Sequence, residues 1–189
     1  MGFQFTPEHI SAIVRGDKIM TRRPRKERER IEYGILPDYD TGERKILAVL
    51  SANAGNGRLK WQVGRDYAVC PGRGKPGVWW QPGLPEWIEP GPDQHLHGIG
   101  YCGYFPLRIR ILAIRQELLG DISPEDCIRE GIIYDGACYR SFVDQPGDCI
   151  SDARSAYQRV WTFINGPRSW KSGFLVWPIT FEVVNAQKT

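Results

Sequence analysis

Residues 16–23 read Gly-Asp-Lys-Ile-Met-Thr-Arg-Arg, and this stretch joins the first predicted helix to the first predicted strand. The helix begins with Thr6-Pro7-Glu8. This order is typical of a helix start, because threonine caps, proline fits the first turn and glutamate suits the positive end of the dipole. Gly16 is a natural helix stop, so the sequence predicts an extended chain from Lys18 to Arg23.

Away from this stretch, predicted strands outnumber predicted helices. The apolar patterns predict strands within 46–50, 61–69, 107–115 and 174–184. Two further helices are expected. One starts at Ser123 and ends at Gly131, and the other is capped by Asp152 and carries an apolar stripe at 3-4-3-4 spacing. Pro178 in the last strand indicates an edge or a bulge. We expect an α+β fold with a small curled antiparallel sheet or pseudo-barrel, flanked by helices.

Two segments interrupt this pattern, so we expect one domain, 1–189, with insertions at about 71–106 and 132–151. The first insertion holds seven prolines and eight glycines, which nearly excludes regular helix. It also carries six aromatic residues: Trp79, Trp80, Trp87, Tyr101, Tyr104 and Phe105. Such rings either fix a long loop to the body of the protein or stack on bases.

The composition excludes several classes of protein. Hydrophobic residues make up 41% and charged residues 25% of the chain, which is ordinary for a globular domain. No apolar run is long enough to span a membrane, and the N-terminus lacks signal-peptide features. The five cysteines are scattered without a CxxC pair, and His95 and His97 with Cys102 do not make a metal site. We expect a cytoplasmic protein with no disulfide framework, metal, cofactor or membrane contact.

Basic residues are concentrated directly after residue 21, although the net charge is only +3. The six basic residues of this cluster stand against two acidic ones, and they are Arg22, Arg23, Arg25, Lys26, Arg28 and Arg30. A basic patch on a nearly neutral body predicts contact with phosphate, and a solvated loop is the alternative. Pro71 to Lys75 is a second candidate phosphate loop, because its glycines expose amides and Arg73 and Lys75 add charge. The alternative there is a tight turn.

The quoted stretch after the capped helix resembles the signature of the ASCH family, whose members have a PUA-like β-barrel. Three further segments resemble the same family in the same order, namely residues 63–69, the helix from 120 to 131, and residues 161–166 that lead into the last strand. Together these segments cover roughly half of the chain, and the two insertions lie outside the resemblance.

The resemblance implies a role with nucleic acids or modified nucleotides. Some small members of the family resemble amidohydrolases that remove the acetyl group from 4-acetylcytidine, and others are described as ribonucleases. In the hydrolase pattern a lysine, a threonine three residues later and a glutamate from the later helix form the site. Lys18, Thr21 and Glu130 match this pattern.

The chemistry of these three residues is consistent in itself. A threonine hydroxyl needs a base, and a lysine can serve only when it is neutral, which burial and nearby Arg22 and Arg23 favour. Glu130 would orient the lysine or protonate the leaving amine. On a regular strand Thr21 and Arg23 share a face that Lys18 does not. The three residues converge only if Lys18 lies in the turn after Gly16. The alternative is an exposed start of a strand.

Three hypotheses follow from these observations. The first is an RNA- or nucleotide-binding module in which Lys18, Arg22 and Arg23 meet phosphate or a base edge, with Arg25, Lys26 and Arg28 adding attraction. The second is an enzyme, either the acetylcytidine hydrolase or a ribonuclease that lacks an obvious general base near the motif. The third is an adaptor that uses the aromatic insertion as a protein contact.

Overall fold

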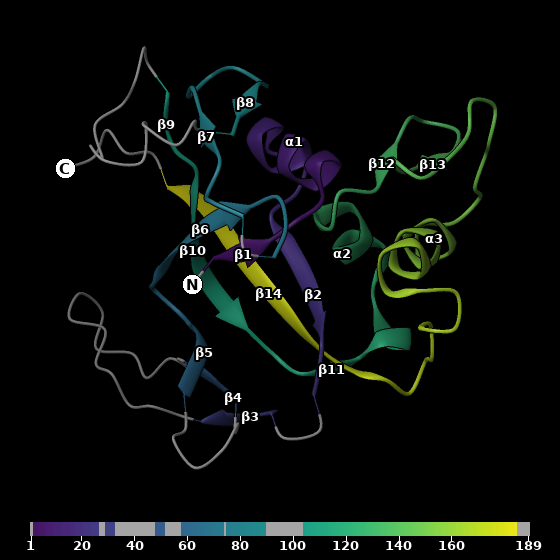
Figure 1. The fold of residues 1–189 in the computed structure, drawn as a ribbon. Helices are drawn as coiled ribbons and strands as arrows, with labels where there is room; N and C mark the ends of the chain where they lie inside the picture. Colours follow the sequence, from purple (N-terminus) through teal and green to yellow (C-terminus); the bar gives the residue numbers. More distant parts are fainter. Residues whose placement is uncertain are drawn as a thin grey trace.

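The main sheet has six strands, which confirms a mixed α+β fold. The computed structural model describes residues 2–26, 29–32, 48–51, 58–73, 75–89 and 104–184. The strands of the sheet are β1 (Phe3–Gln4), β2 (Met20–Pro24), β6 (Asp66–Cys70), β10 (Arg108–Ile114), β11 (Glu117–Leu118) and β14 (Leu175–Val184). Their order is β1-β6-β10-β14-β2, and β11 follows β10 along the same side of β14 (Figure 1).

The two outer strands of this sheet are linked by a side chain. β1 runs parallel to β6, with Phe3 opposite Val69, whereas the other pairs of the sheet are antiparallel as expected. Arg23 on β2 donates a hydrogen bond of 2.5 Å from Nη2 to the backbone oxygen of Gln4 on β1. Among the described residues no strand pairing closes the sheet into a barrel.

Pro178 lies on an interior strand, so the expected edge position is wrong. β14 has β2 on one side and β10 and β11 on the other. The Pro178 oxygen accepts from the Arg115 nitrogen, which lies between β10 and β11. Proline has no N–H to donate to a ladder. The interior position is tolerated because Pro178 stands at the break between these two strands, where no regular ladder bond is lost.

The three helices match the predicted ones: α1 (Pro7–Arg15), α2 (Pro124–Arg129) and α3 (Ala153–Asn165). A side-chain oxygen caps each of them, from Thr6, Ser123 and Asp152 respectively. Gly16 ends α1 with a φ of 84°, a left-handed conformation that glycine adopts without steric cost. A short 3₁₀ turn, η2 (Leu119–Asp121), precedes α2. None of the helices in the described ranges is long and apolar enough to cross a membrane.

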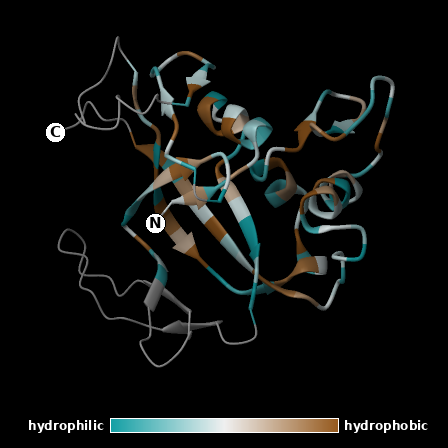
Figure 2. Ribbon diagram, viewed as in Figure 1, coloured by the Kyte–Doolittle hydropathy of each residue, from teal (hydrophilic) through white to brown (hydrophobic). Residues whose placement is uncertain are grey.

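Two hydrophobic cores hold these elements together. The first joins α1 to the main sheet and includes Phe3, Ile10, Ile109 and Trp177. The second lies beneath α2 and α3 and includes Leu119, Ile122, Tyr157 and Trp161. Figure 2 shows hydrophobic segments on the main sheet and on the helices beside it. The boundary between the cores falls within β14, where Val176 belongs to the second core and Trp177 to the first.

The first insertion contributes a small sheet of its own. Its strands are β7 (Trp79–Trp80), β8 (Trp87–Ile88) and β9 (Phe105–Pro106), in the order β8-β7-β9. Trp79 and Trp80 are buried, and Trp87 donates from Nε1 to the Ser11 hydroxyl on α1 at 3.1 Å. These rings fix the segment to the body of the protein. Tyr101, His95, His97 and Cys102 lie outside the described residues.

The second insertion is closed by a disulfide, which corrects the expectation of unpaired cysteines. Cys138 and Cys149 are bonded, and the hairpin of β12 (Ile133–Tyr134) and β13 (Tyr139–Arg140) lies at the start of the loop. This pair was not predictable from the sequence, because its members are 11 positions apart and belong to no recognised motif. Disulfides are rare in reducing compartments, so the cytoplasmic location remains a prediction and this bond weighs against it.

The residues after β2 form a separate three-stranded sheet. It consists of β3 (Glu29–Glu32), β4 (Ala48–Ser51) and β5 (Arg58–Gln62), in that order. The strand expected at 46–50 corresponds to β4. Part of the basic cluster therefore belongs to a strand rather than to a loop. Arg28 lies outside the described residues.

Candidate functional site

Lys18 and Glu130 form a buried ion pair that joins the quoted stretch to the end of α2. Lys18 Nζ lies 2.7 Å from Glu130 Oε2 and 2.6 Å from the Glu130 backbone oxygen. Both side chains are almost completely buried. Lys18 precedes β2, and its backbone nitrogen donates to the Ala12 oxygen in the turn after α1. Lys18 therefore occupies the turn after Gly16 and meets Glu130 there. The described structure has no hydrogen bond between Lys18 and Thr21, so it brings two of the three predicted residues into contact.

Glu130 also contacts Arg22, and Arg22 is saturated by carboxylates. The Arg22 guanidinium pairs with Glu117 at 2.7 Å, with Asp126 at 2.7 Å and with Glu130 at 3.3 Å. Its side chain is fully buried. Arg115 binds Asp126 and Glu117 from the other side. Arg22 therefore holds β2, β11 and α2 together, and its surroundings do not favour the predicted contact with a nucleic-acid phosphate.

A cavity of about 360 Å³ lies next to this network. Thr21 and Glu130 both line it, and so do Tyr157 and Trp161 from α3. The remaining walls come from the β2 residues 22–24, from residues 4–7, from Pro71 and Gly72, and from His9, Val160, Ile164 and Asn165. Ligand pockets typically begin at about 300 Å³, and they combine apolar walls with a few polar groups. The cavity therefore meets the size and the chemistry of a small-molecule site.

Two hydroxyl groups in this cavity have no hydrogen-bond partner among the described residues. The hydroxyls of Thr21 and Tyr157 form no hydrogen bond with any residue that the structure describes. Neither oxygen belongs to the described polar atoms that are both inaccessible to solvent and without a partner. Burial raises the pKa of Tyr157 well above its ordinary value, with the charge of Glu130 adding to the effect. Tyr157 is therefore a neutral phenol, which can donate or accept a hydrogen bond in a ligand complex.

His9 is a cavity residue that the sequence did not reveal. Burial lowers the pKa of its imidazole from 6.5 to about 2, and the charges of Lys18 and Arg23 add to this effect. The ring packs edge-on against Phe142 of the second insertion, with 5.0 Å between centroids. His9 is nine positions before Lys18, but the helix end at Gly16 folds the chain back. It is a neutral donor and acceptor at physiological pH.

Arg23 differs sharply from its neighbour Arg22. Apart from the bond to the Gln4 oxygen, its guanidinium has no hydrogen-bond partner among the described residues, and its Nε is buried without one. It forms no ion pair with any carboxylate in the described ranges. The guanidinium carbon lies 5.7 Å from the ring centre of Phe3 and 5.0 Å from that of Phe5. Arg23 is therefore the cavity cation without an ion pair in the described ranges, although the more distant charge of Glu130 acts on it.

The pKa of Lys18 responds to opposing influences. Burial lowers it most, and the nearby charges of Arg22 and Arg23 lower it further, whereas the Glu130 carboxylate raises it. The resulting shift is downward. A lowered pKa is what a lysine needs in order to act as a base.

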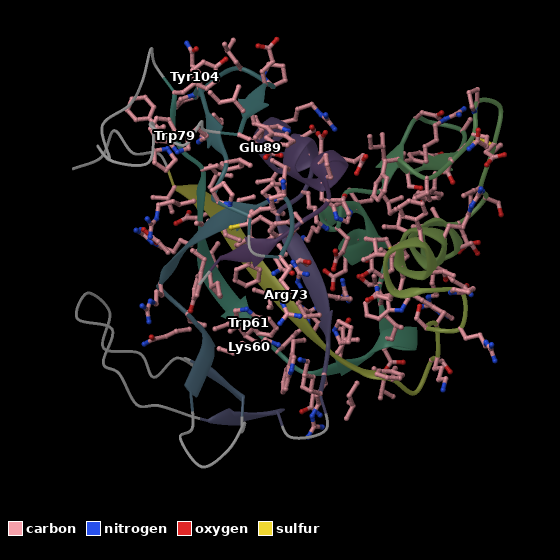
Figure 3. The ribbon with its side chains drawn as sticks, viewed as in Figure 1. Lys60, Trp61, Arg73, Trp79, Glu89 and Tyr104 are labelled. Carbon is pink, nitrogen blue, oxygen red and sulfur yellow. A yellow bond between two sulfur atoms is a disulfide. The ribbon has the colours of Figure 1, made fainter. Side chains whose placement is uncertain are left out.

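The other predicted phosphate contacts lie on segments that border the cavity. Arg25 follows the cavity residue Pro24, and its guanidinium carbon is 5.9 Å from the Trp177 ring centre. Lys26 is exposed. Arg73 and Lys75 are exposed on the loop after β6, and Figure 3 labels Arg73 on this loop. No group of acidic residues, histidines and cysteines suited to a metal ion occurs in the described part of the chain.

Comparison with known proteins gives no relative: no family model, no curated protein and no solved structure matches this chain. The ASCH resemblance therefore remains a prediction from the motif residues. The geometry adds one point of its own. The first and third segments of the resemblance meet at the contact between Lys18 and Glu130.

Proposed function

We propose that this chain is a PUA-like domain of the ASCH type whose cavity binds one modified nucleoside or nucleotide, free or within RNA. The observation that carries the proposal is the cavity of about 360 Å³ between β2 and α3, which exposes unpartnered hydroxyls beside a buried charge network. Rigid polar groups that lack a protein partner are suited to reading the edge of a base.

The surroundings of the cavity support the proposal in two ways. Aromatic and aliphatic side chains of Phe5, Trp161 and Ile164 supply apolar walls for a planar ring. The contact of Arg23 with Gln4 brings β1 and β2 together, as expected for the seam of a strongly curled sheet. The PUA-like barrel itself is part of the proposal.

Calorimetric titration of the whole chain with nucleosides tests the proposal. The panel contains the four common ribonucleosides and 4-acetylcytidine. Thr21→Val and Tyr157→Phe each remove one cavity hydroxyl with little change of shape. Each substitution should lower the affinity for the tightest-binding nucleoside by about fivefold to tenfold, which is the effect of one lost hydrogen bond. Tyr134→Phe is the matched control, because the Tyr134 hydroxyl binds the Gly136 oxygen on the exposed hairpin. If no nucleoside binds, the proposal is wrong.

Amide hydrolysis is a second candidate function, and the contact between Lys18 and Glu130 favours it. In this reaction neutral Lys18 takes the Thr21 proton and Thr21 Oγ attacks the acetyl carbonyl of 4-acetylcytidine. The bond between the carbonyl carbon and the cytosine nitrogen breaks, and the released amine takes up a proton. Water then hydrolyses the acyl-threonine to acetate. The roles of Lys18, Thr21 and Glu130 are those that the resemblance implies.

The two candidates give different results in one assay. Chromatography of 4-acetylcytidine incubated with the protein should show cytidine and acetate if the chain is an enzyme. Thr21→Val should then abolish release while the melting curve stays close to that of the parent. Binding without release leaves the binding module. The ribonuclease alternative would need a general base, and His9 is a histidine that lines the cavity. Its pKa of about 2 makes it a weak base, so it gives this alternative little support.

A further inference from the structure

Two neighbouring arginines of β2 have opposite electrostatic surroundings. Arg22 is bound by Glu117, Asp126 and Glu130, so its charge is neutralised inside the protein. Among the described residues the one hydrogen-bond partner of Arg23 is the Gln4 backbone oxygen, although Arg23 is partly buried in the wall of the same cavity. A cation out of water without an anionic partner is unfavourable. Such a group calls for an explanation, and a ligand that supplies the missing charge is one.

The charged side chains around the cavity also leave an excess of positive charge. The charged side chains that line the cavity are two arginines, Arg22 and Arg23, and one carboxylate, Glu130. His9 adds no charge because it stays neutral, and it supplies no negative group either. The surplus belongs to Arg23. A ligand that carries an anionic oxygen would remove it.

A second segment that the sequence marks for phosphate reaches the same cavity. Pro71 and Gly72 line it, and Arg73 follows them at an exposed position. Arg73 forms no ion pair with any residue in the described ranges. Arg23 and Gly72 are 49 positions apart in the chain, yet both face one cavity. The convergence of an unneutralised arginine and a glycine-containing loop is the arrangement that binds oxyanions.

We infer that the cavity binds its nucleoside through an attached phosphate group, which Arg23 holds from inside and the Pro71–Arg73 segment meets from the rim. This inference rests on the proposed function. The guanidinium is already oriented for the task, because the Phe3 and Phe5 rings and the Gln4 oxygen fix its plane. Its Nη1, which has no partner in the described ranges, and a second N–H group can then meet two phosphate oxygens. Arg23 thereby selects a nucleotide over the matching nucleoside.

The test compares the four ribonucleosides and 4-acetylcytidine with their 5′-monophosphates by calorimetry on the whole chain. The intact protein should bind one monophosphate at least about tenfold more tightly than its nucleoside, as expected for a charge-assisted pair. Arg23→Met should erase this preference, so that the monophosphate and its nucleoside bind the variant with about equal affinity. Arg110→Met is the matched control, since Arg110 lies on β10, outside the cavity lining, and pairs with Asp66. It should keep the preference.

Two further arms complete the experiment. Arg23→Lys keeps the positive charge but loses the planar guanidinium that can bind two oxygens at once, so it should retain part of the preference for the monophosphate. It replaces Arg23→Met if that variant does not fold. A trinucleotide with the same central base shows whether the phosphate belongs to a mononucleotide or to an RNA strand. Equal binding of nucleoside and monophosphate by the intact protein overturns the inference and leaves the proposed function standing. Binding of neither class overturns both.

Discussion

Lys18 Nζ lies 2.7 Å from Glu130 Oε2, and both side chains are almost fully buried. The two residues come from segments that are 112 positions apart. Glu130 reaches Arg22 with its other oxygen, so one carboxylate holds two cations of the quoted stretch. The position of β2 relative to α2 therefore depends on this carboxylate. It also forms part of the cavity wall, which couples the stability of the fold to the shape of the site.

Neutralising Glu130 should lower the free energy of unfolding far more than neutralising a surface carboxylate does. Glu130→Gln leaves two buried cations without their shared partner, and the expected loss in the free energy of unfolding is about 3–5 kcal/mol. Asp17→Asn is the control, because Asp17 pairs with Arg15 at an exposed position and should cost at most about 1 kcal/mol. Urea unfolding of both variants measures the difference. Similar small losses for the two variants would show that the buried pair does not hold the fold.

His9 should make the protein sensitive to mild acid. Its pKa is 6.5 when exposed and about 2 in the fold, so below pH 6.5 the unfolded chain binds a proton that the folded chain does not. Stability is therefore lost as the pH falls from 7 to 5, by about 2 kcal/mol. His9→Asn should remove this part of the pH dependence. Urea unfolding at several pH values tests it, and parallel curves for parent and variant would contradict the assignment.

The disulfide of the second insertion should stabilise the fold measurably. Closing a loop of this length is worth about 3 kcal/mol in the chain-entropy description. Cys138→Ser combined with Cys149→Ser should lower the melting temperature, and a reducing agent should lower that of the parent to the same value. The double variant itself should not respond to the reducing agent. A parent whose melting curve ignores reduction would show that the bond contributes nothing to stability.

Local sequence signals were sufficient to predict the three helices and the turn at Gly16. Thr6, Ser123 and Asp152 each cap the helix that the sequence places after them, because capping depends on a side chain and a backbone only three residues away. The turn at Gly16 is equally local. It places Lys18 ahead of the strand, which is what the Lys18 contact with Glu130 needs.

Long-range relationships could not be predicted from these signals. The strand period places Arg22 and Arg23 on opposite faces, but nothing in the sequence indicates which face meets the carboxylates. Their difference arises because β2 pairs with β14 and brings one of them to the carboxylates of β11 and α2. His9 reaches the cavity, and Cys138 meets Cys149, through the same kind of tertiary packing. The charge cluster was visible in the sequence, but its division into a structural and an uncompensated arginine was not.

Trp161 should prove to be a structural residue of the second core. It is 3% exposed, and its Nε1 donates to the Ser169 oxygen at 3.2 Å. Trp161→Ala should therefore lower the free energy of unfolding by about 3–5 kcal/mol, the usual cost of removing a large buried aromatic side chain. Phe163→Ala is the matched control. Phe163 lies on the same helix but is 68% exposed, and its truncation should cost no more than about 0.5 kcal/mol.

Urea unfolding of these two variants at pH 7 separates packing from ligand binding at Trp161, which also lines the cavity. A large loss in the free energy of unfolding that occurs for Trp161→Ala but not for Phe163→Ala places the Trp161 side chain in the core. Any change in nucleotide affinity is then a consequence of the displacement of α3. A loss below about 1 kcal/mol would contradict this assignment, because a fully packed indole cannot be removed so cheaply. The ring would then be available to stack on a base, and its truncation should weaken nucleotide binding without changing stability.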